Sequence, residues 1–93
     1  MINLTYDDEK RHKTLVERGL DFARAGEVFD GSTKTVEDTR QDYREARFIT
    51  VGYLDRRMVV LVWTPRGAAR RIISMRKAND REQAIYQRQL GGP

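Results

Sequence analysis

The segment Met58-Val59-Val60-Leu61-Val62-Trp63 constrains the fold most, because six consecutive apolar residues occur in a chain of which 34% is charged. A run of this length that is rich in β-branched residues is typical of a central strand buried on both faces of a sheet. Both faces therefore need a cover. One cover is expected from a helix with an apolar stripe, formed by Phe22, Ala25, Gly26 and Phe29. The other cover is either a partner molecule or a shallow cleft.

Capping residues and alternating patterns place the other elements around this strand. Asp7 and Asp21 are suited to begin helices, and Gly19 is suited to end the first one. Asn79 and Glu82 form a capping signature for a last helix. The expected order is a strand at 2–6, helices at 7–19 and 22–29, an edge strand at 34–37, a hairpin of strands 47–54 and 58–64 joined across 55–57, a turn at 65–67, a strand at 70–77 and a helix at 79–90. The chain is thus predicted to be a single α+β domain over residues 1–90, with an antiparallel meander sheet and a fraying tail at 91–93.

Charge is distributed unevenly along the chain. Residues 1–45 contain eight Lys and Arg against eleven Asp and Glu, whereas residues 46–93 contain ten against three. The net charge of +4 (18 minus 14) therefore divides into −3 and +7. This asymmetry favours a polyanionic partner for the basic half, most often RNA or DNA. A solvated strand edge, on which Lys and Arg discourage aggregation, explains the composition equally well.

Four of these cations lie in the expected strand at 70–77. Because side chains alternate along a strand, Arg76 and Lys77 are expected to face opposite ways and cannot both bind one phosphate unless a bulge or the strand end intervenes. Strict alternation places Arg70, Ile72, Ser74 and Arg76 on one face, and Arg71, Ile73, Met75 and Lys77 on the other.

Several function classes are excluded or disfavoured by composition. The chain has no cysteine, and therefore no disulfide framework, thiolate metal site or cysteine nucleophile, which suits a reducing cytoplasm. Its single histidine, His12, excludes an acid–base pair of two histidines. No apolar run approaches the length of a bilayer span, and the acids at 7–9 argue against a signal peptide. The carboxylates at 7–9 and 37–38 are explained by a helix start and an acidic loop, so no metal or other cofactor is expected.

Short strings spread over residues 2–86 carry a resemblance to a known family. They are Tyr6-Asp7 with Lys10, Phe22 and Ala25 through Glu27-Val28-Phe29-Asp30, Asp38 to Asp42, Glu45 and Arg47 before Phe48-Ile49, Val51-Gly52, Thr64-Pro65-Arg66-Gly67, and Arg71-Ile72-Ile73-Ser74-Met75-Arg76-Lys77-Ala78 with Glu82 and Tyr86. In this pattern the chain resembles the BrnT toxins of bacterial type II toxin–antitoxin systems, which are RelE-like ribonucleases. Members of that family usually carry Asn, and then Lys-His-Gly, where this chain has Thr14 and Glu17-Arg18-Gly19.

The resemblance implies both an activity and a partner. It implies a RelE-like fold and an endoribonuclease that cuts mRNA and arrests growth. It also implies neutralisation by a BrnA-type antitoxin with a ribbon-helix-helix domain. In such a complex only the antitoxin contacts DNA. The exposed side of the apolar strand also favours a protein partner, and we expect an antitoxin-mediated heterotetramer.

Four residues are candidates for catalysis: Glu45, Arg47, Arg66 and Arg76. RNA can be cut without a metal when its 2′-OH attacks the adjacent phosphorus, provided that the protein positions the nucleotide and stabilises the developing charge. Arg76 is the expected phosphate clamp, although a strand-end arginine in a salt bridge gives the same sequence pattern. Glu45 shares a face with Arg47 and is either the general base or a neutralising partner for an arginine. Arg66 lies in the expected turn, where it either contacts a phosphate or is only solvated. The guanidinium groups of the late strands are expected to converge on one shallow anion pocket.

Four further residues are candidates for RNA contact: Lys10, Arg71, Lys77 and Tyr86. The ring of Tyr86 can stack on a base, but a half-buried tyrosine packed on a sheet is the more common arrangement. Trp63 is expected in the core. The alternative function is a non-catalytic basic module that binds an acidic protein or nucleic acid, since no trio of nucleophile, base and acid can be named. DNA binding by the chain itself is not expected, because no basic recognition helix is present.

Overall fold

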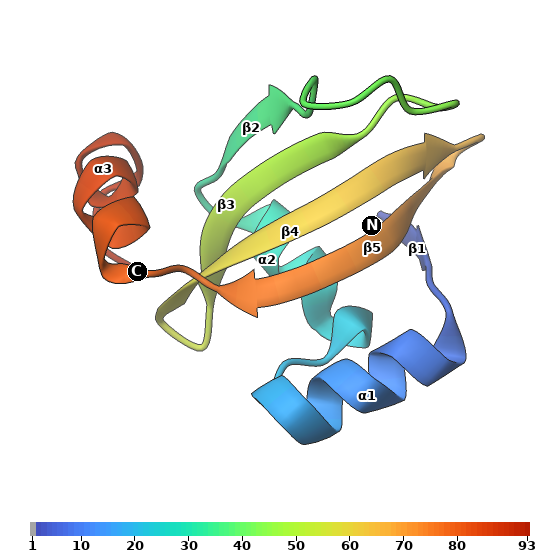
Figure 1. Cartoon of the computed structure of the whole chain (residues 1–93). Coiled ribbons are helices and arrows are strands. Elements are labelled where there is room, and N and C mark those ends of the chain that lie inside the picture. The colour runs from blue at the N-terminus through green and yellow to red at the C-terminus, as the bar shows by residue number, and fades with distance from the viewer. Residues whose placement is uncertain (1) are drawn as a thin grey trace.

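The computed structural model describes residues 2–93 and consists of a five-stranded sheet with helices on both faces (Figure 1). The strands are β1 (Asn3–Thr5), β2 (Lys34–Glu37), β3 (Phe48–Leu54), β4 (Arg57–Arg66) and β5 (Ala69–Lys77). The helices are α1 (Asp8–Arg18), the 3-10 turn η1 (Phe22–Arg24), α2 (Ala25–Asp30) and α3 (Asp80–Leu90). Within residues 2–93, no helix has the length and apolar character needed to cross a membrane.

The sheet has the strand order β1-β5-β4-β3-β2. Strands β2 to β5 form an antiparallel meander, whereas β1 runs parallel to β5 along Ala69–Arg71. The predicted α+β fold, with a short strand and helices before a meander and a helix after it, is confirmed. The parallel pair makes the sheet mixed, because the helical segment carries the chain from β1 at one edge to β2 at the other.

The first two helices are fixed by the carboxylates that precede them. Asp7 accepts hydrogen bonds from the backbone N–H groups of Glu9 and Lys10, and the helix ends at Gly19 with a φ of 70°. Asp21 caps η1 and also binds Arg11 of α1 at 2.8 Å, which ties the two helical segments together. The expected continuous helix at 22–29 is instead the 3-10 turn η1 followed by α2.

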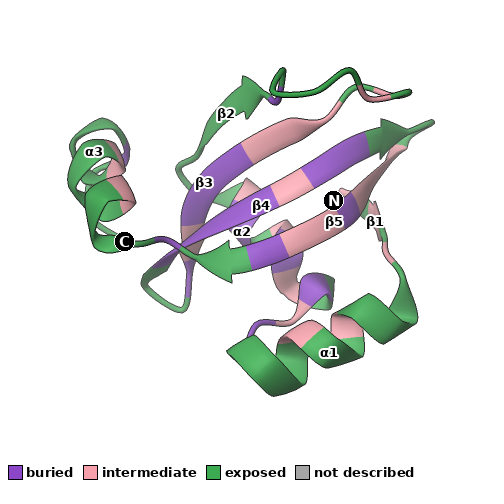
Figure 2. Cartoon of the chain, viewed as in Figure 1, coloured by how far each residue is buried: buried purple, intermediate pink, exposed green. Residues whose placement is uncertain are grey.

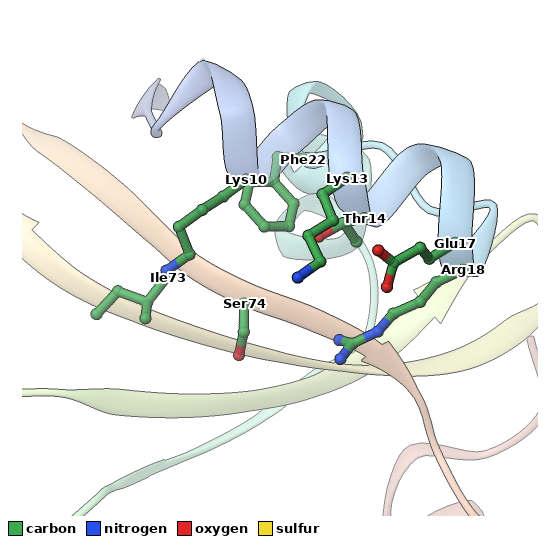
Figure 3. A pocket seen from close by; sticks show the side chains of 8 residues that line it. All are labelled: Lys10, Lys13, Thr14, Glu17, Arg18, Phe22, Ile73 and Ser74. Atoms are coloured by element: carbon green, nitrogen blue, oxygen red, sulfur yellow. The ribbon is translucent and has the colours of Figure 1, made fainter.

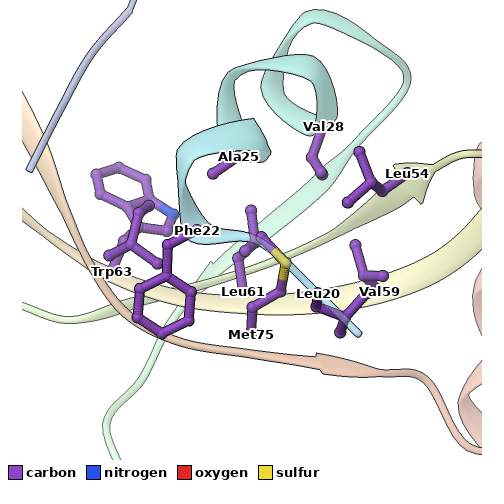
Figure 4. Close-up of a cluster of buried hydrophobic side chains, with 10 residues drawn as sticks. Leu20, Phe22, Ala25, Val28, Leu54, Val59, Leu61, Trp63 and Met75 are labelled. Atoms are coloured by element: carbon purple, nitrogen blue, oxygen red, sulfur yellow. The ribbon is translucent and has the colours of Figure 1, made fainter. Parts of the chain in front are cut away.

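The main core lies between the sheet and the segment from Leu20 to α2 (Figure 4). Trp63 contributes to it as expected: its side chain is buried, its indole N–H donates to Thr50 Oγ1 at 2.8 Å, and Phe48 stacks on its ring. The ten buried side chains of this core are Leu20, Phe22, Ala25, Val28, Leu54, Val59, Leu61, Trp63, Ile72 and Met75.

Close approach of α2 to the sheet depends on Gly52 in β3. A Cβ at this position would lie 2.7 Å from Cγ1 of Val28 and 3.0 Å from Cγ2 of Thr33, both too short for a normal contact. The absence of a side chain at Gly52 therefore allows the helix to pack directly on the strand.

The opposite face of the sheet is covered only at one end, by α3 (Figures 1 and 2). Tyr53 Oη donates to the carbonyl of Gly91 at 2.6 Å, and Ser32 Oγ donates to the carbonyl of Leu90, so the end of α3 is held against the sheet. The residues buried beneath this helix are Val51, Met58, Val60, Ala78 and Leu90, and Ile49, Tyr53 and Tyr86 pack against them. The second cover of the apolar strand is thus partly α3, and the remainder of that face is open.

Two turns differ from their expected positions. β4 begins at Arg57, so the hairpin turn is formed by Asp55 and Arg56 alone, both with positive φ. Arg24 holds this turn through two contacts of 2.6 and 2.7 Å with the Asp55 carboxylate. The expected turn at 65–67 is wrong, because β4 continues through Arg66 and the chain reverses at 67–68.

Candidate nucleic-acid interface

A β-bulge in β5 decides which basic side chains share a face of the sheet. Val62 pairs with Ser74 but Trp63 pairs with Ile72, so Ile73 has no partner on β4. One extra residue reverses the alternation on its two sides. The strict alternation predicted from the sequence is therefore wrong. The strand register places Arg71, Ser74 and Arg76 on the face opposite α2, and Arg70, Ile72, Met75 and Lys77 on the face toward it.

The uncovered part of the face opposite α2 is called here the open sheet face. The strand registers align one residue of each strand from β2 to β5 across its centre: Val36, Ile49, Val62 and Ser74. The side chain of Val36 is 44% exposed, and the other three residues are half-buried (Figure 2). Arginines border this row on both sides, with Arg47 and Arg71 toward one end of the strands and Arg76 toward the other. An apolar row between cationic borders can accept bases while the borders contact phosphates.

Arg47 is held in place by the loop that precedes β3. Its guanidinium lies 4.2 Å from the ring centroid of Tyr43, and its buried Nε has no hydrogen-bond partner among residues 2–93. The hydroxyl of Tyr43 donates to Asp38, whose side chain is only 1% exposed. Arg40 binds the same carboxylate through two contacts of 2.8 Å and holds the pKa of Asp38 well below its usual range.

Sequence reasoning missed Arg40 and Tyr43 as parts of the site. Their one signal is that they lie within or next to the string from Asp38 to Asp42, which contributes to the family resemblance. Nothing in the local pattern indicates that Tyr43 lies beneath Arg47, because that contact depends on how the loop folds back.

Arg71 and Arg47 are the guanidinium groups on this face without an acid. Neither lies within 4.0 Å of a carboxylate in residues 2–93. Arg71 lies on β5 opposite Thr64 of β4, and Arg47 directly precedes β3 on the other side of Thr64, so their backbones are roughly 10 Å apart from the spacing of adjacent strands. Two unpaired cations at this separation can contact neighbouring phosphate groups of one strand.

Arg76 is held by an acid of its own. Its guanidinium makes two contacts of 2.7 Å with the carboxylate of Glu82, which also accepts from the backbone N–H of Asn79 at 2.9 Å. Chiefly because of Arg76, and against the effect of burial, the pKa of Glu82 is lowered to about 2. The sequence allowed either a phosphate clamp or a salt bridge at Arg76, and the structure contains the salt bridge, with Glu82 of α3 as the partner. A phosphate at Arg76 must displace this carboxylate.

Arg66 is likewise paired, at the far end of β4. Its Nη2 lies 3.1 Å from Oε1 of Glu45, so Glu45 acts as a neutralising partner in this structure. Arg76 pairs with Val60 of β4, and Arg66 is six residues further along the same strand. The backbones of Arg66 and Arg76 are therefore roughly 20 Å apart. The expected convergence of the late-strand arginines on one anion pocket is therefore wrong for Arg66 and Arg76, which point to separate carboxylates.

The four residues expected to contact RNA do not form one surface. Arg71 lies on the open sheet face, whereas Lys77 lies on the face toward α2 and Lys10 lies on α1. Tyr86 is half-buried and packs against the core beneath α3, which is the more common arrangement foreseen for it. Within residues 2–93, no three His, Asp or Glu side chains are grouped so that they could hold a metal ion.

These features define a class of protein: a small α+β domain whose open sheet face places arginines beside an apolar row, an arrangement suited to binding a polyanion. The family model described as ribonuclease toxin, BrnT, of type II toxin-antitoxin system matches residues 6–82. The chain therefore belongs to the BrnT family of ribonuclease toxins, as the sequence resemblance predicted, and membership of a type II system implies an antitoxin partner. No curated protein matches the chain.

Proposed function

We propose that the protein is an endoribonuclease toxin that cuts mRNA without a metal ion, and that the RNA strand lies across the open sheet face. The observation that carries this proposal is the pair Arg47 and Arg71, which lie on one face with no carboxylate partner in residues 2–93. A phosphodiester can occupy their donors without first breaking an ion pair. Bases can rest on the row that contains Ile49 and Val62.

The proposed reaction is attack of the RNA 2′-OH on the adjacent phosphorus. The O2′–P bond forms, the P–O5′ bond breaks, and the proton lost from O2′ is balanced by one gained at O5′. Guanidinium groups that contact the non-bridging oxygens stabilise the extra charge of the transition state. In the proposal one of Arg47 and Arg71 supplies these contacts at the scissile phosphate and the other holds the neighbouring phosphate. Arg76 contacts a further phosphate of the strand when that phosphate displaces Glu82. Glu45 is the candidate base, since a phosphate that draws Arg66 away frees its carboxylate.

The proposed partner is a BrnA-type antitoxin with a ribbon-helix-helix domain, in a complex of two toxins and two antitoxins that contacts DNA only through the antitoxin. Support comes from the apolar row of the open sheet face, in which Val36 is exposed and Val62 is half-buried. An antitoxin segment on that row would block the RNA site directly. Unopposed toxin acts in the cytoplasm in this proposal, and cleavage of mRNA there arrests growth.

The decisive experiment measures cleavage of a long RNA by the purified protein in EDTA, with Arg71→Ala as the test variant. We expect cleavage by the unsubstituted protein and a loss of about 10²–10³-fold in the variant, equivalent to about 2.7–4 kcal/mol of transition-state stabilisation. Arg81→Ala is the matched control, because Arg81 is an exposed arginine of α3 without an ion pair in residues 2–93. Urea unfolding should show that both variants remain folded with stabilities within about 0.5 kcal/mol of the parent.

Intact RNA at a large excess of the unsubstituted protein, in EDTA and in Mg²⁺ alike, would show a non-catalytic basic module instead. Cleavage that requires Mg²⁺ would overturn the metal-free mechanism. Equal cleavage by the Arg71→Ala and Arg81→Ala proteins would remove Arg71 from the site.

A further inference from the structure

A second basic site lies outside the open sheet face, in the groove between α1 and the edge of β5 (Figure 3). β1 pairs with residues 69–71 of β5, and no strand within residues 2–93 adjoins the rest of this edge. The groove has a volume of about 290 Å³, and its polar lining includes Lys10, Lys13, Glu17 and Arg18 from α1 and Ser74 from β5, with Thr14, Phe22 and Ile73 completing it. That volume is at the lower limit of small-ligand sites, roughly 300 Å³, and suits one nucleotide unit better than a folded element.

The side chains from α1 reach this groove because of their helical spacing. Residues 10, 13 and 17 are three and four positions apart and therefore share a side of the helix, with Arg18 next to them at its end. Figure 3 shows the ends of Lys10 and Arg18 directed toward the strand edge. Three of the four are cations and only Glu17 is an acid. Lys10 and Lys13 form no ion pair within residues 2–93, so their charges are uncompensated.

The bulge in β5 connects this groove to the open sheet face. Arg18 donates to the carbonyl of Met75 at 2.9 Å, just beyond the bulged residue Ile73, so the end of α1 is fixed on the strand edge. Ser74 lines the groove and also ends the apolar row of the open sheet face. A chain that crosses the open sheet face along this row therefore leaves it at Ser74 and enters the groove.

We infer that the groove between α1 and β5 binds the sugar–phosphate backbone of single-stranded RNA next to the segment on the open sheet face. This inference rests on the proposed ribonuclease function and adds a second binding site to it. Lys10 and Lys13 contact the phosphate as point charges, and the guanidinium of Arg18 retains N–H groups beyond the one that binds Met75. Glu17 opposes the phosphate and weakens binding at this site.

Binding of a fluorescent single-stranded RNA of about twelve nucleotides, fully 2′-O-methylated so that it cannot be cut, tests the inference in the full chain. Anisotropy titrations over a range of NaCl concentrations give the slope of log K against log [NaCl], which is about −0.7 per phosphate contact for single strands. The double variant Lys10→Ala, Lys13→Ala should weaken binding and make the slope shallower by about 1.4. Its matched control, Arg81→Ala with Arg88→Ala, removes two exposed cations of α3 and should keep the parental slope.

A gain of affinity provides evidence that misfolding cannot imitate. Glu17→Lys should tighten binding and steepen the slope by about 0.7, because the change replaces a repulsive charge by one more contact. Glu37→Lys is the matched control, since Glu37 is an exposed acid on β2 at the opposite edge of the sheet. Equal changes in Glu17→Lys and Glu37→Lys would show a general charge effect and overturn the inference.

Each of the remaining outcomes also supports or overturns the inference. A parental slope in the Lys10, Lys13 double variant would exclude the groove as a phosphate site. If the Lys10, Lys13 double variant lost binding to a poly-glutamate peptide but bound RNA as the parent does, the groove would instead be a site for an acidic protein partner, and the inference would be overturned. Cleavage of unmodified RNA is measured separately. Slopes that change as expected, without any cleavage by the parent, would support the groove as a phosphate site and refute the nuclease. Cleavage by the parent with unchanged slopes in the variants would support the nuclease and refute the groove.

Discussion

Replacement of Glu82 by Gln tests the ion pair that holds Arg76. Gln keeps the size of the side chain and the capping bond to Asn79, so the change removes mainly the charge that faces Arg76. A carboxyl whose pKa falls from 4.5 to about 2 corresponds at face value to about 3 kcal/mol of stability. Because the Arg76 side chain is 46% exposed, solvent screening reduces this figure, and we expect a loss of about 1 kcal/mol at pH 7.

The pH dependence of this loss has a defined sign. The folded pKa of Glu82 lies below its unfolded value, so its ion pair stabilises the protein above pH 4.5 and that stabilisation is lost as the pH falls from 4.5 toward 2. Urea unfolding of the parent and of Glu82→Gln at pH 7 and at pH 3 measures the difference. Glu37→Gln is the control, since Glu37 is exposed and unpaired within residues 2–93. A difference below 0.3 kcal/mol at pH 7, or one of equal size at both pH values, would refute the reasoning.

Two other changes test how the site is supported. Gly52→Ala should destabilise the protein by about 1–3 kcal/mol in urea unfolding, because its Cβ would meet Val28 at 2.7 Å, whereas Gly26→Ala, whose nearest contact is at 4.0 Å, should not. Equal stabilities of these two variants would contradict the packing of α2 on β3. Asp38→Asn should cost about 1–2 kcal/mol and increase proteolysis within residues 39–46, because its buried carboxylate holds Arg40 and the loop beneath Arg47. A loop that resists protease as well as the parental loop does would show that other contacts hold it.

Much of the fold follows from short-range patterns in the sequence. The apolar run Met58–Trp63 is the central strand β4, and the caps at Asp7 and Asn79 begin helices where the pattern predicts them. The errors are local: helix 22–29 begins as a 3-10 turn, and β4 extends past its predicted end at Thr64. Boundaries of this kind depend on contacts with other elements, such as the bond between Arg11 and Asp21.

The candidate site was less accessible to sequence reasoning. Alternation along residues 70–77 was the correct rule, but the unpaired Ile73 reverses it and moves Arg71 to the face of Arg76. A bulge is a property of two paired strands, so no pattern within one strand reveals it. The acids that neutralise Arg76 and Arg66 lie 6 and 21 residues away along the chain. Which arginines stay free is therefore set by the packing of α3 and of the loop before β3.

The sequence by itself determined the α+β class, the central strand and the excess of positive charge in the second half, because each depends on composition or on neighbours a few residues apart. Only the tertiary structure decided that Arg47 and Arg71 remain unpaired on one face and that α1 meets the edge of β5 in a basic groove. The physical reason is that ion pairs and strand register form between residues distant in the chain, where they are selected by geometry and desolvation rather than by local preference.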